Sequence, residues 1–243
     1  MPQNQALSDI NTLLEGLPSK DRQQLLSQCD QVQLILGNTL YEQGEVMNHV
    51  YFPIDSFISL IMPIKGGSSL EVGLIGNEGM YGTSVLLGIY ISPFQSVIQG
   101  AGTAMRIEVT AFLHELAQSA PLLRKLQRYL YVEMRQLAQT AACNRFHLVE
   151  QRLARWLLMT KDRAHSTEFN ITQEFLSRML GVRRVGVTKA ASSLQKQKLI
   201  SYRRGAMHIQ DVAGLEAAAC SCYSADKETY DFMLMNTALK STK

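Results

Sequence analysis

Hydrophobic and polar positions follow two different patterns along the 243-residue chain, and the pattern changes near residue 110. Between about residues 34 and 108, apolar residues form short runs rich in β-branched and aromatic side chains, such as "VYFPIDSFISLIMPI" and "LEVGLI". Turns such as "KGGSS" separate these runs. Many short strands with glycine turns predict a small barrel or jelly roll. Ahead of them, "ALSDINTLLEGLPSKDRQQLLSQC" predicts short helices broken at Gly16-Leu17-Pro18.

Helical periodicity dominates beyond this region. The stretch "TAFLHELAQSAP" predicts a short helix with Thr110 as its N-cap, and Pro121 suits the first turn of the next helix. In that second helix, apolar residues recur at steps of three and four, at Leu123, Leu126, Leu130, Met134, Leu137 and Ala141. Such a narrow stripe favours a two-helix dimer seam, and the alternative is a helix lying on its own barrel.

Two short amphipathic helices are predicted on either side of Gly181, after a helix "HLVEQRLARWLLMTKD" whose Trp156 we expect in the core. Thr172 is the expected N-cap of the first, and its apolar residues fall on one face. Gly181 can take the positive φ that ends this helix. The second helix has an apolar arc of Val187, Ala190, Ala191 and Leu194, in which the alanines permit a close crossing.

The opposite face of this second helix is polar and basic. It presents Arg183, Arg184, Val185, Thr188, Lys189, Ser192 and Lys196. A solvated helical face would also explain this charge. The following segment, "LISYRRGAMHIQ", however, predicts a strand, a turn at Gly205 and a second strand, with Arg203 and Arg204 at the tip. A helix pair followed by a basic hairpin favours a winged helix-turn-helix that binds DNA, with the hairpin on phosphates.

Net charge and cysteine spacing limit the alternatives. The net charge of +3 is too small to indicate nucleic-acid binding by itself, so the distribution of charge matters. Cys29, Cys143, Cys220 and Cys222 show no repeated pair at zinc spacing, so we expect free thiols and no metal site. For "CSCY", a thiol sensor or metal clip stays open beside a single short C-terminal helix, "GLEAAACSCY".

The sequence also bears on where the protein acts and on whether it is an enzyme. The chain start lacks a signal-peptide pattern, and its apolar runs are far shorter than the roughly 18 residues of a spanning helix. We therefore expect a cytoplasmic protein without membrane contact. The sequence shows no catalytic triad order, Walker loop or metal triad, so we expect no enzyme.

With these features in place, the chain resembles the Crp/Fnr family of bacterial transcription regulators over nearly its whole length. The most specific match is Ile171 to Gln210, and "LYEQGE" with "VYFPIDSFISLI" fits the family's β-roll. The resemblance implies an α+β chain with a β-roll (1–110), a short helix and a long dimerisation helix (111–146) and a winged helix-turn-helix (147–243). It also implies a homodimer on a two-fold operator in double-stranded DNA, with RNA polymerase as a further partner.

The resemblance assigns roles within the helix-turn-helix, with three departures. Arg184, Val185 and Lys189 fall where the family usually touches bases, and Thr172 and Gln173 where it meets the DNA backbone. Arg183 stands where a small hydroxyl residue often caps the recognition helix, and Val185 where an acidic residue is common. Gly186 lies inside the helix at a cost of roughly 1 kcal/mol against alanine. These departures affect the operator sequence but not DNA binding itself.

The expected effector site departs more strongly from the family pattern than the helix-turn-helix does. Cyclic-nucleotide members of the family use a Gly-Glu pair and a later arginine, whereas here Thr83 follows Gly82 and Pro93-Phe94-Gln95 stand near the arginine position. Losing the guanidinium removes a charge-assisted contact to the cyclic phosphate. Haem and iron–sulfur sites are not indicated, so we expect no cofactor. The pocket candidates are Gly82, Thr83, Val85, Leu86 and Phe94, in a lining extended by Leu87, Ile89, Tyr90 and Ile91. They predict either self-filling or an uncharged, apolar effector.

Overall fold

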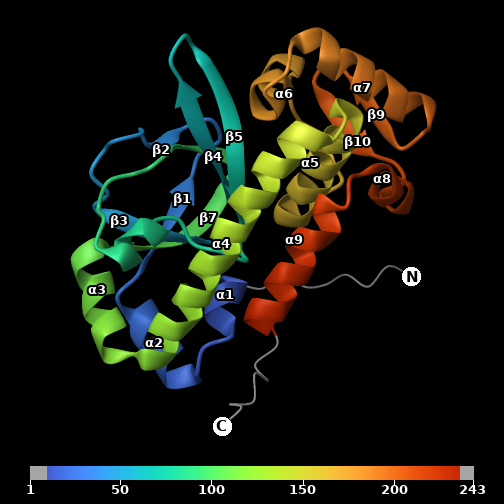
Figure 1. Ribbon diagram of the computed structural model, residues 1–243. Coiled ribbons are helices and arrows are strands. Elements are labelled where there is room, and N and C mark those ends of the chain that lie inside the picture. Colours follow the sequence, from blue (N-terminus) through green and yellow to red (C-terminus); the bar gives the residue numbers. More distant parts are fainter. Residues whose placement is uncertain (1–9, 236–243) are drawn as a thin grey trace.

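The computed structural model describes residues 10–235 and consists of two lobes joined by one long helix (Figure 1). The N-terminal lobe contains two antiparallel sheets, one in the order β1-β7-β3 and the other in the order β2-β6-β4-β5. Together they form the small β-roll that the short apolar runs predict. The elements are α1 (Thr12–Glu15), α2 (Ser19–Ser27), β1 (Asp30–Leu34), β2 (Thr39–Tyr41), β3 (His49–Pro53), β4 (Phe57–Ile64), β5 (Ser68–Ile75), the 3-10 helix η1 (Thr83–Leu87), β6 (Gln95–Gly100) and β7 (Gly102–Glu108).

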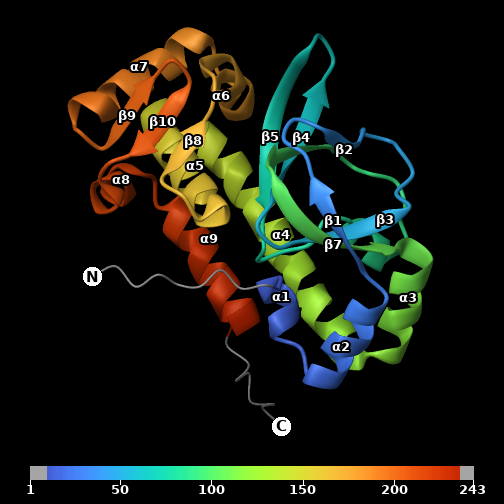
Figure 2. The ribbon, with the colours of Figure 1, turned by 180° about the vertical axis from the view of Figure 1, so that it is seen from behind.

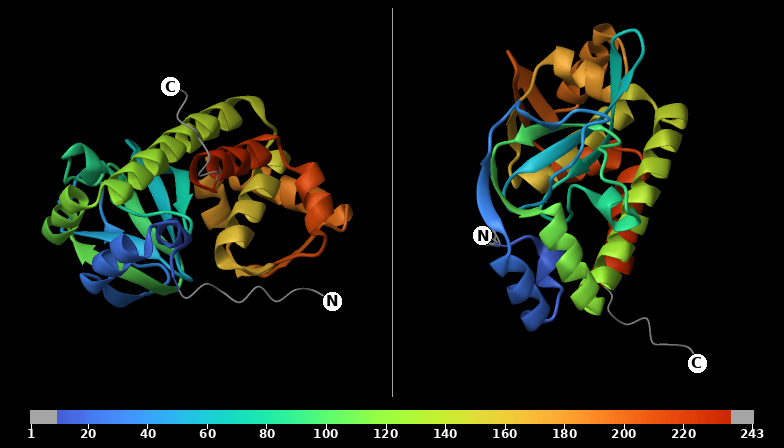
Figure 3. Two further views of the ribbon diagram at one scale, coloured as in Figure 1. Left: turned by 90° about the horizontal axis from the view of Figure 1, so that it is seen from below. Right: turned by 90° about the vertical axis from the view of Figure 1, so that its left-hand side faces the viewer.

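Helices α3 (Val109–Gln118) and α4 (Ala120–Phe146) follow the roll. The expected N-cap at Thr110 is wrong, because α3 begins at Val109 and Thr110 lies inside it; the N-cap is Glu108, two residues earlier, which makes no side-chain capping bond. Helix α4 is capped by Ser119, whose Oγ accepts the Leu122 N–H at 3.1 Å, and Pro121 lies in the first turn as expected. Viewed from below, α4 runs alongside both lobes with α9 beside it (Figure 3).

The C-terminal lobe is a helical domain with a small sheet in the order β8-β10-β9 (Figure 2). The single C-terminal helix expected for "GLEAAACSCY" is wrong, because two helices form and Cys220 lies between them. The elements are α5 (Val149–Ala164), β8 (Glu168–Asn170), α6 (Gln173–Leu180), α7 (Arg184–Lys196), β9 (Ile200–Arg203), β10 (Ala206–Ile209), α8 (Val212–Ala218), α9 (Cys222–Tyr230) and the π-helical turn η2 (Asp231–Met235).

Each lobe has its own hydrophobic core, and buried polar contacts join the two. Trp156 is buried as expected, but its indole N–H also donates to Glu71 Oε1 on β5 at 2.6 Å. Ser59 on β4 donates to the other carboxylate oxygen of Glu71 at 2.5 Å. An ion pair between Arg163 and Glu78, at 2.7 Å, adds a second link. The β-roll and the helical domain are thus held together by specific pairs as well as by apolar packing.

Candidate nucleic-acid interface

Helix α6 forms as the sequence predicts. The Thr172 hydroxyl oxygen accepts the N–H of Phe175 at 3.1 Å, which satisfies one of the free donors at the start of the helix. Leu176, Met179 and Leu180 are buried against the rest of the lobe. Gly181 ends the helix with a φ of 61°, a left-handed conformation that glycine adopts most easily. The turn that follows sets the angle between α6 and α7.

Helix α7 separates its two faces as expected. The buried face consists of Val187, Ala190, Ala191 and Leu194. The opposite face is exposed to solvent and carries Arg183, Arg184, Val185, Thr188, Lys189 and Ser192. Arg183 is the N-cap but forms no side-chain capping bond, so its guanidinium is available for other partners. The Val185 side chain is 61% exposed, so an apolar group stands among the cations of this face.

Helices α6 and α7 are linked by a side-chain hydrogen bond. The Thr188 hydroxyl lies 3.2 Å from Gln173 Oε1 and 3.0 Å from the carbonyl oxygen of Arg184. Contact with the Thr188 hydroxyl leaves the amide N–H₂ group of Gln173 free to donate outward. The two residues therefore belong to one surface, and Gln173 is oriented from α7.

A two-residue turn closes the hairpin β9–β10. Arg204 has a φ of 52° and Gly205 a φ of 89°, so both central residues are left-handed, as in the tight turns that suit strand twist. Tyr202 donates from its hydroxyl to the carbonyl oxygen of Ile171 at 2.8 Å and anchors the hairpin beside the start of α6. Arg203 and Arg204 lie at this turn and are both exposed. Figure 2 shows β9 and β10 side by side at the edge of the helical domain.

The helix pair and the hairpin are rich in exposed cations. Arg178, Arg183, Arg184, Lys189, Lys196, Lys198, Arg203 and Arg204 are all exposed. None of them forms an ion pair with another residue between positions 10 and 235. Exposed cations without ion-pair partners suit a polyanionic ligand, and a helix beside a hairpin suits a DNA groove with its flanking phosphates.

The residues expected to line an effector pocket mainly pack the roll. Gly82 has a φ of 100°, and a Cβ there would lie 2.7 Å from a methyl carbon of Val50. Thr83 donates to Glu133 Oε2 on α4 at 2.5 Å. Val85 is fully buried, whereas Leu86 and Phe94 are half-buried against the same core.

Of the residues predicted to extend the lining, Leu87, Ile89 and Ile91 are between 50% and 62% exposed, and Tyr90, 41% exposed, lines a surface groove with Val46 and Leu113. The four predicted residues form an apolar surface loop directly after η1. Tyr41 and Tyr81 are buried in the core of the roll, where their rings stack with centroids 5.8 Å apart. The Tyr81 hydroxyl lies 2.7 Å from Ser92 Oγ.

The apolar stripe on α4 divides between two environments. Leu126 is fully buried in the core of its own lobe with Leu122, Tyr129 and Val132, so its assignment to the seam is wrong. Leu126 lies at the edge of the stripe, on the side of the helix that faces the N-terminal lobe. Five members stay at least partly exposed, and they are Leu123, Leu130, Met134, Leu137 and Ala141. Met134 is 61% exposed.

The fold brings together one group of residues that the sequence analysis did not connect. His147 follows α4 and lies beside Cys143, Cys220 and Cys222. The spacing Cys-x-x-x-His at a helix end and the pair Cys-x-Cys are the signals that could have found this cluster.

In the described part of the chain, no helix is long and apolar enough to cross a membrane.

Comparisons with known proteins agree with this geometry. Residues 151–218 match the Crp-like helix-turn-helix domain. No curated protein shows significant sequence similarity to the chain. The fold is similar to that of FixK2 from Bradyrhizobium japonicum, with a TM-score of 0.67 and 13% identity over 79% of this chain and 98% of that one.

Two further structures show the same fold. The c-di-GMP responsive global regulator CLP from Xanthomonas campestris has a TM-score of 0.65 and 15% identity, over 79% of this chain and 99% of that one. A transcriptional regulator of the CRP family from Thermus thermophilus has a TM-score of 0.65 and 18% identity, over 77% of this chain and 96% of that one. At these identities the likeness concerns the fold.

Proposed function

We propose that this chain, a Crp/Fnr-type transcription regulator with a DNA-binding helix-turn-helix domain, binds a two-fold promoter operator as a homodimer and without a cyclic nucleotide. The exposed face of α7 carries the proposal, since its cations lack protein partners and stand beside a basic hairpin. The family consists of regulators and not of enzymes. We further propose that the protein acts in the cytoplasm, with RNA polymerase as a partner at the promoter.

Base reading is assigned to the first two turns of α7. Arg184 and Lys189 are exposed there and can donate to O6 and N7 of guanine in the major groove. Val185 between them offers an apolar surface that suits the methyl group of thymine. Contacts of this kind distinguish one operator from another, whereas contacts to phosphates do not.

Phosphate binding is assigned to the residues that flank α7. Thr172 and Gln173 stand at the start of α6, where backbone N–H groups and the helix dipole favour an anion. Arg203 and Arg204 lie at the tip of the hairpin, within reach of the next stretch of backbone. Alanine at Arg203 and Arg204 together should weaken binding to operator and random DNA alike and should reduce the salt dependence by about one phosphate each.

The dimer is proposed to form through the exposed part of the α4 stripe, the set Leu123, Leu130, Met134, Leu137 and Ala141. These positions repeat at steps of seven, four, three and four, which is the spacing of a two-helix seam. The exposed apolar residues from Leu87 to Ile91 continue from η1, whose first residue, Thr83, is bonded to Glu133 on α4. Both surfaces are apolar and exposed in one chain, and a second copy would cover them.

Independence from cyclic nucleotides is supported by the charge at the expected site. Thr83 stands where cyclic-nucleotide members carry a glutamate, and it donates to the carboxylate of Glu133 on α4. Burial raises the pKa of Glu133 to about 7, and the bond from Thr83 opposes this shift. Neither form of this carboxyl group would attract an anion as an arginine does. A shallow groove lined by Val46, Tyr90 and Leu113 among others favours the alternative, an uncharged apolar effector.

The test is DNA binding by purified full-length protein without additives. Operator DNA would first be identified by genome-wide mapping of binding sites, and affinity would then be measured by fluorescence anisotropy with operator and scrambled DNA. We expect tight, sequence-dependent binding, and no heat on calorimetric titration with cyclic AMP or cyclic GMP. Equal affinity for both DNAs would contradict a sequence-specific regulator. Micromolar nucleotide binding with increased DNA affinity would overturn the interpretation of Thr83.

A further inference from the structure

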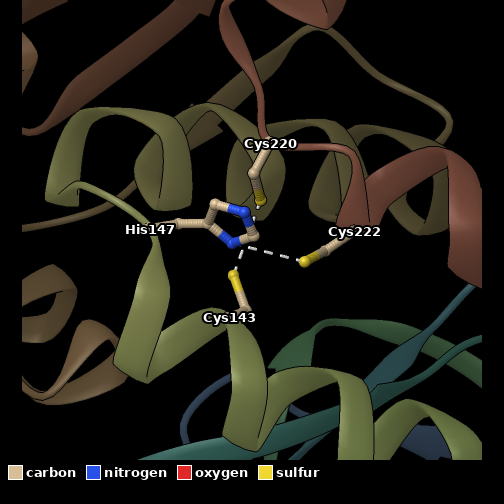
Figure 4. Close-up of side chains that lie close together, drawn as sticks. All are labelled: Cys143, His147, Cys220 and Cys222. Atoms are coloured by element: carbon tan, nitrogen blue, oxygen red, sulfur yellow. Dashed lines mark hydrogen bonds between the residues drawn. The ribbon is translucent and has the colours of Figure 1, made fainter.

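Three cysteines and one histidine from two distant segments meet at the end of α4 (Figure 4). Cys143 lies in the last turn of α4, and His147 is the residue directly after that helix. Cys220 lies between α8 and α9, and Cys222 is the first residue of α9. The four side chains point toward one another in Figure 4.

The distances between these groups suit one metal ion. All four candidate ligand atoms lie within 4.8 Å of one another. Cys143 Sγ is 3.5 Å from Cys220 Sγ, and Cys222 Sγ is 3.5 Å from His147 Nδ1. In a tetrahedral zinc site, metal–sulfur bonds of about 2.3 Å place neighbouring sulfur atoms about 3.8 Å apart. The observed cluster needs only small side-chain adjustments to reach that geometry.

Ordinary core packing explains the cluster less well. The three cysteines are buried as a separate group, apart from the apolar cores of both lobes. They also lie beside His147, which is half-buried and offers a nitrogen toward the sulfur atoms. A disulfide would use only two of the four groups and would leave the other two without a role.

Polar neighbours complete the site. The side-chain amide of Gln139 donates to Cys222 Sγ at 2.9 Å, as the outer partners of metal-bound thiolates do. The buried guanidinium of Arg155 interacts electrostatically with Cys143 and Cys220 and is also paired with Asp226 at 2.7 Å. Three thiolates, one neutral imidazole and a divalent ion carry a net charge of −1, which a nearby guanidinium offsets.

We propose that Cys143, His147, Cys220 and Cys222 bind one thiophilic divalent cation, with Zn²⁺ as the best fit, in a closed structural site. Four protein ligands leave no position for water or substrate, so the site is structural. The ion fastens the end of α4 to the junction of α8 and α9. It therefore holds the DNA-binding lobe at a set position relative to the long helix. The metal site stands independently of the operator and dimer proposed above.

Metal content of the full-length protein is the first measurement. After anaerobic purification and incubation with Zn²⁺, we expect about one ion per chain by mass spectrometry of the metal. Cys143→Ser and Cys220→Ser should each lose most of it. Cys29→Ser is the matched control, because Cys29 lies in the N-terminal lobe outside the cluster and should leave the metal content unchanged.

Two further measurements do not depend on ligand variants that could fail to fold. Stripped wild-type protein given Co²⁺ should show thiolate charge-transfer and tetrahedral d–d absorption bands, and Zn²⁺ should raise its Tm. Gln139→Leu keeps all four ligands and should lower metal affinity roughly 10- to 100-fold. Stripped protein that binds neither ion, or a native Cys143–Cys220 disulfide in non-reduced peptides, would overturn the proposal. None of these readouts involves DNA, so they separate the metal site from the proposed regulator function.

Discussion

Glu71 should make the stability of the protein depend on pH in a defined direction. Its carboxyl group is buried between the lobes, where it accepts hydrogen bonds from Ser59 and Trp156. Burial raises its pKa from 4.5 to about 7, and the two hydrogen bonds together with Arg163 and Arg155 limit the rise. The folded protein therefore holds a proton on Glu71 under conditions in which the unfolded chain has released it.

The sign and size of the effect follow from this difference. A group whose pKa is raised on folding adds stability below its unfolded pKa, and this contribution disappears as the pH rises through its folded pKa. Between pH 4.5 and pH 7 or above, the free energy of unfolding should fall by about 3 kcal/mol from Glu71, since each pKa unit corresponds to about 1.4 kcal/mol. Exchanging Glu71 for glutamine removes this dependence, because an amide of the same shape stays neutral and still accepts from Trp156.

Urea unfolding of wild type and Glu71→Gln, at several values between about pH 5 and about pH 8, measures the effect. Trp156 is the only tryptophan and contacts Glu71 directly, so its fluorescence reports on the site. The variant should gain stability relative to wild type as the pH rises. The exposed Glu216→Gln is the matched control and should leave the wild-type profile unchanged. Glu133 is present in every protein compared and does not enter the difference.

A constant difference between Glu71→Gln and wild type across this pH range would refute the reasoning. In that case the variant would lose as much stability between about pH 5 and about pH 8 as the wild type does. This result would mean that Glu71 stays ionised in the folded protein, with Arg155 and Arg163 stabilising the charge more than burial destabilises it.

Three other predictions concern DNA binding, assembly and the recognition helix. Alanine at Arg184 or Lys189 should cost roughly 1–3 kcal/mol on operator DNA and little on random DNA, measured by anisotropy, and equal losses on both would indicate phosphate contacts instead. Met134→Glu should make the protein monomeric in sedimentation, because the charge would be buried without a partner in a dimer but faces water in a monomer. A wild type that is already monomeric at micromolar concentration would exclude the dimer seam. Gly186→Ala should raise stability by roughly 1 kcal/mol in thermal unfolding, since its Cβ would meet only Val182, at 3.8 Å. If this alanine also weakens operator binding, DNA approaches the helix closely at that position, whereas unchanged stability would contradict the helix-propensity argument.

Local pattern determined the helix pair and the hairpin from the sequence alone. The residues of α6 and α7 repeat with the helical period, so their buried and exposed faces follow from spacing. Gly181 and the pair Arg204-Gly205 occupy positions where the backbone is left-handed, and a glycine signals such a turn without tertiary information. Exposed cations need no partner, so their place on the helix face was predictable too.

Tertiary structure decided every feature that depends on which surface meets which. Leu126 belongs to the same periodic stripe as Leu130, but the roll covers it, and a period cannot show how far a neighbouring lobe extends around a helix. The segment from Leu87 to Ile91 is apolar like a pocket lining and yet lies on the surface, because other side chains, Tyr41 and Tyr81 among them, make up the core of the lobe.

Pairs far apart in the chain were equally beyond the sequence. Glu71 and Trp156 are 85 positions apart, and Cys143 and Cys220 are 77 apart. Spacing along a chain carries information only over the few residues that share a helix or a strand. Contacts between such distant residues arise when two lobes pack, and packing depends on the shape of whole surfaces rather than on any local repeat.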